Sequence, residues 1–146
     1  YGVGVTLVGS MVYAFQMYFV LNKTAGGVAN TISLGFGGTA TVNNILYGGA
    51  YNDNNGVFAS GTVGTSATFD ANTVASTVAS GSSANATRSL RYYLNGTVSI
   101  NAGGTFIPQY SLNNAPGGAY STIAGSYFFI YPLGASGANT SIGTWA

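Results

Sequence analysis

The chain lacks the residue types on which most catalytic and metal sites depend. Its 146 residues contain no Cys, no His and no Glu. These absences exclude a Ser–His triad, a Cys–His pair, a disulfide framework and a zinc site built on His or Cys. The two carboxylates, Asp53 and Asp70, lie in separate segments, and nothing in the sequence brings them together as a glycosidase pair. We therefore predict that the protein is not an enzyme, binds no metal and needs no cofactor.

Charge is also scarce. Charged residues make up 3% of the chain, whereas they make up roughly a quarter of an ordinary soluble domain. The five charged residues are Lys23, Asp53, Asp70, Arg88 and Arg91, and they leave a net charge of +1. A net charge near zero favours association, and the sequence offers no basic patch for a nucleic acid. We expect a surface of Ser, Thr, Asn, Gly and Tyr that packs against other protein copies, with no nucleic acid partner.

A long uncharged run opens the chain. Residues 1–22 carry no charge, which makes them a formal candidate for a membrane-spanning helix. Glycines at positions 2, 4 and 9 interrupt the run, however, and its β-branched and aromatic residues favour strands. We predict no membrane insertion. Because the chain begins with Tyr1 rather than Met, we expect it to be the C-terminal part of a longer protein.

The residues that are present indicate an all-β fold. Hydrophobic residues reach 47%, and short apolar stretches alternate with clusters of Gly, Asn, Pro and Ser. Many short strands at such spacing are typical of a sandwich or a barrel. We predict a single domain over residues 1–146, an antiparallel jelly-roll sandwich of about eight strands. Strands are expected over residues 11–21, 31–36, 39–47, 90–100, 105–112 and 120–131, with weaker candidates at 57–63 and 67–78.

Turn-forming residues predict the breaks between these strands. Residues 48–56, GGAYNDNNG, and residues 113–118, NNAPGG, have the composition of loops. Asn95-Gly96 is expected to form a hairpin turn or a bulge. Pro108 lacks a backbone N–H, so we expect it at a sheet edge or a bulge.

The C-terminal part resembles a known family. Within residues 91–134, RYYLNGTVSINAGGTFIPQYSLNNAPGGAYSTIAGSYFFIYPLG, the matching pieces are Asn95-Gly96-Thr97, Gly103-Gly104-Thr105 with Pro108-Gln109, Ala115–Gly118 and Gly125-Ser126-Tyr127. This pattern, together with the closing GTWA, resembles the C-terminal jelly-roll domain of tailed-bacteriophage virion proteins. The resemblance implies a TNF-like sandwich that assembles as a trimer on capsid decoration proteins, head fibres or tail appendages.

These observations lead to one main hypothesis. We expect a non-catalytic structural protein on the surface of a phage virion, a homotrimer whose other partners are virion proteins such as the major capsid protein. Aromatic side chains with a polar tip are favoured at protein interfaces. The residues expected at the subunit interface are Tyr92, Phe106, Tyr110, Tyr127 and Phe129.

Two alternatives remain open at this point. The apolar segment 1–21 could be donated to a neighbouring subunit of an extracellular prokaryotic filament. The chain could instead be a receptor tip that binds a host-surface carbohydrate through Tyr51, Asn54 and Tyr120, in or next to the predicted loops.

Overall fold

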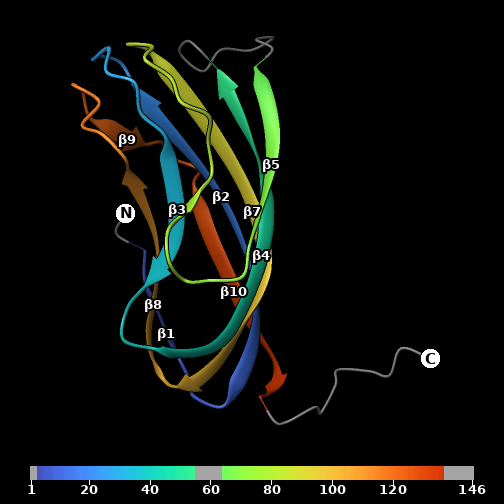
Figure 1. Cartoon of the computed structure of the whole chain (residues 1–146). Helices are drawn as coiled ribbons and strands as arrows, with labels where there is room; N and C mark the ends of the chain where they lie inside the picture. The colour runs from blue at the N-terminus through green and yellow to red at the C-terminus, as the bar shows by residue number, and fades with distance from the viewer. Residues whose placement is uncertain (1–2, 55–63, 137–146) are drawn as a thin grey trace.

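Two antiparallel β-sheets face each other and enclose an aromatic core (Figure 1). The computed structural model describes residues 3–54 and 64–136. Within these residues the strands are β1 (Val5–Leu7), β2 (Met11–Lys23), β3 (Ile32–Gly37), β4 (Thr41–Asn54), β5 (Thr65–Ala71), β6 (Thr77–Val78), β7 (Arg88–Ala102), β8 (Gly104–Leu112), β9 (Tyr120–Thr122) and β10 (Tyr127–Ala135).

The smaller sheet has the order β1-β8-β3-β6, and the larger has the order β10-β2-β7-β4-β5, with β9 also pairing with β2. All the strand pairs are antiparallel. The prediction of an all-β, jelly-roll-like sandwich is confirmed.

The alternation in residues 11–21 explains the central position of β2. Its odd-numbered side chains, among them Phe15, Met17 and Phe19, are buried between the sheets. Its even-numbered side chains lie on the outer face of the larger sheet, because successive side chains of a strand point to opposite faces. The strand pairs with β7 along its whole length and with β9 and β10 on its other side.

Aromatic rings hold the two sheets together. Phe36 of β3 stacks on Phe106 of β8, with centroids 4.7 Å apart. Both rings contact Phe15 of β2 from the opposite sheet, at 5.1 and 6.2 Å. A second stack joins Phe19 to Tyr92 at 4.7 Å within the larger sheet. Burying such a side chain contributes about 2–3 kcal/mol, so this cluster stabilises the sandwich more than any surface contact.

The strand β4 corrects one prediction. Residues 48–54 do not form the expected loop but continue β4 to Asn54, paired with β7 and β5. Gly49 permits this pairing because a Cβ there would overlap the carbonyl oxygen of Tyr93 in β7. The loop composition thus reflects close strand packing rather than a turn. Positions 55 and 56 and the expected strand at 57–63 lie outside the described residues.

Asn95-Gly96 is a second correction. The pair forms neither a turn nor a bulge, because β7 runs through it in unbroken register with β2. Gly96 lies opposite Tyr47 of β4, and a Cβ at Gly96 would overlap the backbone of Leu46. The irregularities of the larger sheet lie elsewhere, near Val42 in β4 and between Pro132 and Gly134 in β10.

The prolines occupy positions where a missing N–H is tolerated. At Pro108 the strand β8 pairs with β3 alone, since β1 reaches only as far as Phe106. Pro132 lies in β10, an edge strand of the larger sheet. The expected last strand at 120–131 is divided into β9 and β10 and continues past Pro132 to Ala135, and the candidate at 67–78 is divided into β5 and β6.

Replacing Gly49 by Ala should destabilise the protein, because the new methyl group would force β4 away from β7. We expect a loss of about 1–3 kcal/mol in the free energy of unfolding, measured by urea denaturation. The matched control is Gly134→Ala, since a Cβ at Gly134 meets nothing within 4 Å. That variant should stay within about 0.5 kcal/mol of the wild type. Equal stability of both variants would contradict the close packing at Gly49.

Candidate interaction surface

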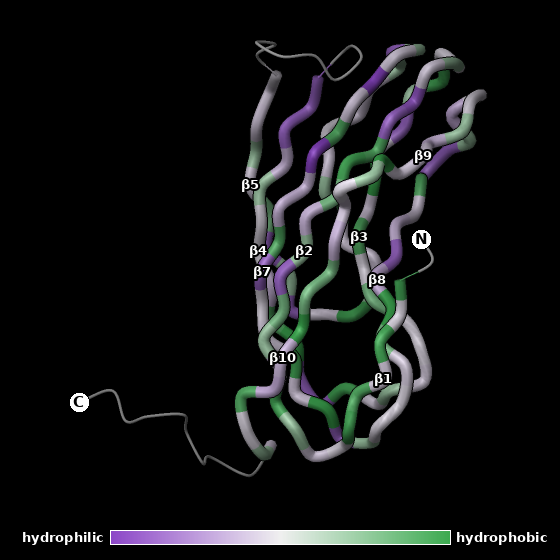
Figure 2. The backbone as a smooth tube through the Cα atoms, turned by 180° about the vertical axis from the view of Figure 1, so that it is seen from behind, coloured by the Kyte–Doolittle hydropathy of each residue, from purple (hydrophilic) through white to green (hydrophobic). Residues whose placement is uncertain are grey.

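Three of the five charged side chains lie inside one end of the sandwich. Lys23 ends β2, Asp53 lies near the end of β4, and Arg88 begins β7. Each continues the inward-facing alternation of its strand. Lys23 is 1% exposed and Arg88 is fully buried, and the Asp53 side chain is 14% exposed. Figure 2 shows the hydrophilic positions gathering toward this end, where β4 and β2 finish and β7 starts.

The guanidinium of Arg88 has partners at all three nitrogens. Its Nη2 lies 2.6 Å from Oδ2 of Asp53 and donates to the carbonyl of Gly81 at 2.8 Å. Its Nε donates to both carboxylate oxygens at 3.1 Å. Its Nη1 donates to the carbonyl of Asn30 at 3.3 Å and to the hydroxyl of Tyr120 at 3.4 Å. Burial acts to lower the pKa of Arg88, but the bonds to Asp53 and Tyr120 outweigh it and raise the pKa.

The same cluster joins three loops. The hydroxyl of Tyr120 donates to Oδ1 of Asn30 at 3.1 Å. The backbone of Asn30 pairs with Ser83 in both directions at 3.1 Å, and its amide Nδ2 donates to the carbonyl of Val28 at 2.8 Å. The segment after β2, the segment before β7 and the first residue of β9 therefore meet at one buried ion pair.

Lys23 completes the cluster. Its ammonium donates to the carbonyl of Gly26 at 3.0 Å and lies 5.6 Å from the centre of the Tyr120 ring. Burial, together with the positive charge of Arg88, lowers the pKa of Lys23. Because the partners of these charges come from the chain itself, we interpret the cluster as structural.

This cluster changes the view of the predicted carbohydrate residues. Tyr120 is 9% exposed and bonded to Asn30 and Arg88, and Asn54 is 8% exposed, so neither presents a face to a sugar. Tyr51 is half-buried, and its hydroxyl accepts a bond from the N–H of Gly81 at 3.0 Å. It borders a surface hollow of about 370 Å3 that also includes Asp53 and residues 81–85. Of the three predicted residues, Tyr51 is the one that lines this hollow.

Two of the predicted interface residues belong to the core. Tyr92 is fully buried and Phe106 is 1% exposed, so neither can contribute area to a subunit contact. Tyr92 shares its face of β7 with Leu90 and Leu94, and this apolar face turns inward. Phe106 lies on the inward face of β8 in the same way, opposite Thr105.

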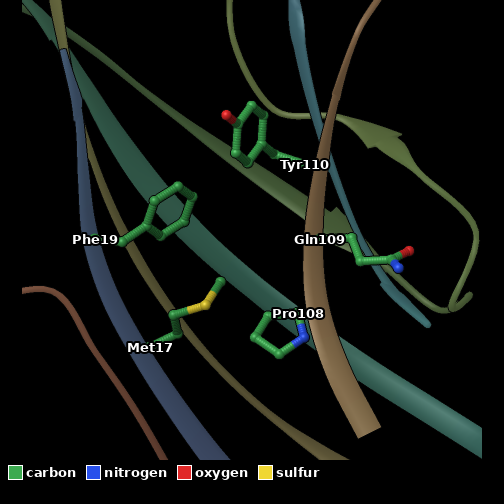
Figure 3. Close-up of a pocket in the computed structure, with 5 residues that line it drawn as sticks. All are labelled: Met17, Phe19, Pro108, Gln109 and Tyr110. Carbon is green, nitrogen blue, oxygen red and sulfur yellow. The ribbon is translucent and has the colours of Figure 1, made fainter. Parts of the chain in front are cut away.

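Tyr110 also turns inward. It points with Pro108 from β8 toward Met17 and Phe19 of β2, whereas Gln109 points away (Figure 3). The space between these side chains is about 10 Å3, which is at most the room for one water molecule. It is therefore a packing gap rather than a ligand pocket.

The other two predicted interface residues are exposed on the larger sheet. Tyr127 is 43% exposed and Phe129 is 55% exposed. In register, Tyr127 of β10 lies beside Tyr18 of β2, and Tyr18 lies beside Tyr93 of β7. The rings of Tyr18 and Tyr127 are 6.1 Å apart. A row of three tyrosines thus crosses three adjacent strands on the outside of the sandwich.

More apolar side chains lie on the same face. Phe129 and Tyr131 follow Tyr127 along β10, and their rings are 5.5 Å apart. Leu46 of β4, 61% exposed, lies farther along the sheet, opposite Thr97 of β7. Polar side chains lie between them, and the amide of Gln16 donates a hydrogen bond to the hydroxyl of Tyr93. We call this surface the outer aromatic face and define it by Tyr18, Leu46, Tyr93, Tyr127, Phe129 and Tyr131. The alternation of β7 indicated the outer side for Tyr93, which shares its face with Arg91 and Asn95. Strands β2 and β10 are apolar on both faces, so the sequence did not show the side on which Tyr18 and Tyr131 lie.

In comparisons with known proteins, no family model, no curated protein and no solved structure matches the chain. Among the described residues, no helix is long and apolar enough to cross a membrane.

Replacing Asp53 by Asn should strongly destabilise the fold, because it leaves the buried guanidinium of Arg88 without a counter-charge. We expect a loss of about 3 kcal/mol or more in the free energy of unfolding. Asp70→Asn is the control, since Asp70 is exposed, and its effect should be about 0.5 kcal/mol or less. Urea denaturation of both variants measures the difference. Similar small losses would show that the fold does not depend on the ion pair.

Stability should fall at alkaline pH. Burial raises the pKa of Tyr92 well above its ordinary value of 10.0. A group whose pKa is raised in the folded state stabilises the protein fully below its unfolded pKa, and this stabilisation is lost as the pH rises further. We expect the Tm to decline above about pH 10, and Tyr92→Phe to reduce the slope of that decline. A slope that is unchanged in Tyr92→Phe would show that this buried hydroxyl does not govern the decline.

Proposed function

We propose that the chain is a non-catalytic structural domain that assembles with copies of itself, as a trimeric jelly roll on the surface of a phage virion. The observation that carries the proposal is the placement of the charges. Lys23, Asp53 and Arg88 lie within the sandwich. The charges of these three residues add up to +1, which is the net charge of the whole chain.

The remaining charges cancel each other on the outside. Arg91 is half-buried on β7 and Asp70 is exposed on β5, and both lie on the outer face of the larger sheet. The sequence outside the described ranges contains no charged residue. Soluble monomers normally carry net charge that keeps their copies apart. The surface of this chain carries no net charge, so copies of the chain can approach each other without electrostatic repulsion.

The placement of the carboxylates supports a non-catalytic role. Asp53 faces inward and is bonded to Arg88, whereas Asp70 lies on the outer face of the neighbouring strand. The two groups are thus on opposite faces of one sheet and are not arranged as an acid–base pair. The virion setting rests on the sequence resemblance of residues 91–134 and agrees with a jelly-roll-like sandwich.

The alternatives have less support. Strand donation would use segment 1–21, but β2 pairs with strands of its own chain on both sides and β1 pairs with β8. The receptor-tip hypothesis loses two of its three residues to the interior, Asn54 and Tyr120. Other virion proteins, such as the major capsid protein, remain the proposed further partners.

Light scattering on the purified chain at several concentrations tests the proposal. We expect a particle of three times the 14.7 kDa chain mass. It should persist at about 1 M salt, because uncharged surfaces are not screened. A monomer at every concentration would contradict self-assembly. Gold-labelled antibody against the chain, viewed by electron microscopy, should mark phage particles in the source culture, whereas labelled extracellular filaments would favour strand donation.

A further inference from the structure

We infer that the outer aromatic face is the surface on which a second copy of this chain docks. This inference rests on the proposed self-assembly and names the surface that performs it. Of the residues that define this face, Leu46, Tyr93, Tyr127, Phe129 and Tyr131 have exposed fractions between 43% and 61%.

The size of the face matches the apolar part of a protein interface. An aromatic side chain has about 150–250 Å2 of surface to bury. The four most exposed rings, Tyr93, Tyr127, Phe129 and Tyr131, are about half exposed and so present on the order of 400 Å2. A stable interface buries about 800 Å2 per partner, of which slightly more than half is apolar. The rings therefore supply most of the apolar area that one subunit needs.

The charges on this side favour a second copy over a charged partner. Arg91 and Asp70 lie on the outer side of the larger sheet and have opposite signs, so the sheet has no net charge toward a neighbour. An acidic or a basic partner would meet no complementary field there. A second copy offers the same balance of charge. Each contact of a closed trimer joins two different parts of the surface, so the rings of one copy meet another uncharged part of its neighbour.

The shape of the sheet favours contact through its face rather than through its edge. The strand β10 is an edge strand, and an open edge could add a strand from another chain. Pro132 removes one N–H from this edge, and the register shift between Pro132 and Gly134 bends it. Natural proteins use such prolines and bulges to prevent strand addition. We therefore expect the exposed rings of β10 to contact a second copy through the outer face of the sheet and not through its edge.

A hollow next to the rings gives room for side chains of the second copy. It has a volume of about 520 Å3 and lies over Gly48, whose position on the outer face carries no side chain. Leu46, Asp70 and Asn95 also line it. In register, Asn95 lies beside Gln16, and Gln16 lies beside Phe129. A flat aromatic strip and an adjacent hollow on one face allow side chains of two copies to interlock.

The test compares Phe129→Lys with Val78→Lys by light scattering over a range of concentrations. Val78 is 60% exposed on β6 of the other sheet and is the matched control. A lysine at position 129 would place an unpaired charge in the apolar contact. We therefore expect the dissociation constant for self-assembly of the Phe129→Lys variant to be at least about a hundredfold higher than that of the wild type, as for a strong interface residue. Val78→Lys should assemble like the wild type. Urea denaturation confirms that both variants fold.

A second measurement uses the absence of cysteine from the chain. In Tyr127→Cys, the rate of maleimide labelling should fall at least tenfold between dilute and concentrated protein, whereas Val78→Cys should label at a constant rate. If the wild type assembles but the position-129 and position-127 variants behave like their controls, the docking surface is elsewhere and the proposed function stands. If the wild type is monomeric throughout, both proposals fail.

Discussion

The buried ion pair between Arg88 and Asp53 is the constraint on which one end of the sandwich depends. A guanidinium that is fully removed from water is tolerated only when its charge and its N–H groups have partners. The carboxylate supplies the charge, and the carbonyls of Gly81 and Asn30 and the hydroxyl of Tyr120 supply most of the other acceptors. The loops that carry these acceptors are therefore fixed in place, although they contain few apolar residues of their own.

This arrangement also determines the character of the surface. A chain with five charged residues that places three of them inside has almost none left for its exterior. Solubility then depends on Ser, Thr, Asn and the tyrosine hydroxyls, and the outer aromatic face lies among them without a charged rim on the β10 side. The same distribution of charge thus explains both features: the charges that form the internal cluster are missing from the exterior, where the proposed docking surface lies.

The sequence was sufficient for the fold class but not for the sites. Alternation in residues 11–21 predicted a strand that is now seen to be central, because odd and even positions are both apolar there. In β7, by contrast, the alternation sets Tyr92 on the same face as Leu90 and Leu94, opposite Arg91. Tyr92 was predicted at an interface because of its polar tip, but it lies in the interior. The inward position of Arg88 was within reach, since it continues the alternation of Leu90 and Tyr92. Its partner Asp53 lies 35 residues away, in a stretch whose glycines suggested a loop.

The order of the strands has a consequence for how the chain folds. The strand β2 is synthesised before its neighbours β7 and β10, which lie in the second half of the 146 residues. Its mostly apolar residues must therefore wait without a partner until those strands exist. Sheets built from such distant pairings fold slowly, and an unpaired apolar strand is prone to aggregate meanwhile. The interval between the synthesis of β2 and the arrival of its neighbours is therefore the stage of folding at which aggregation competes most strongly.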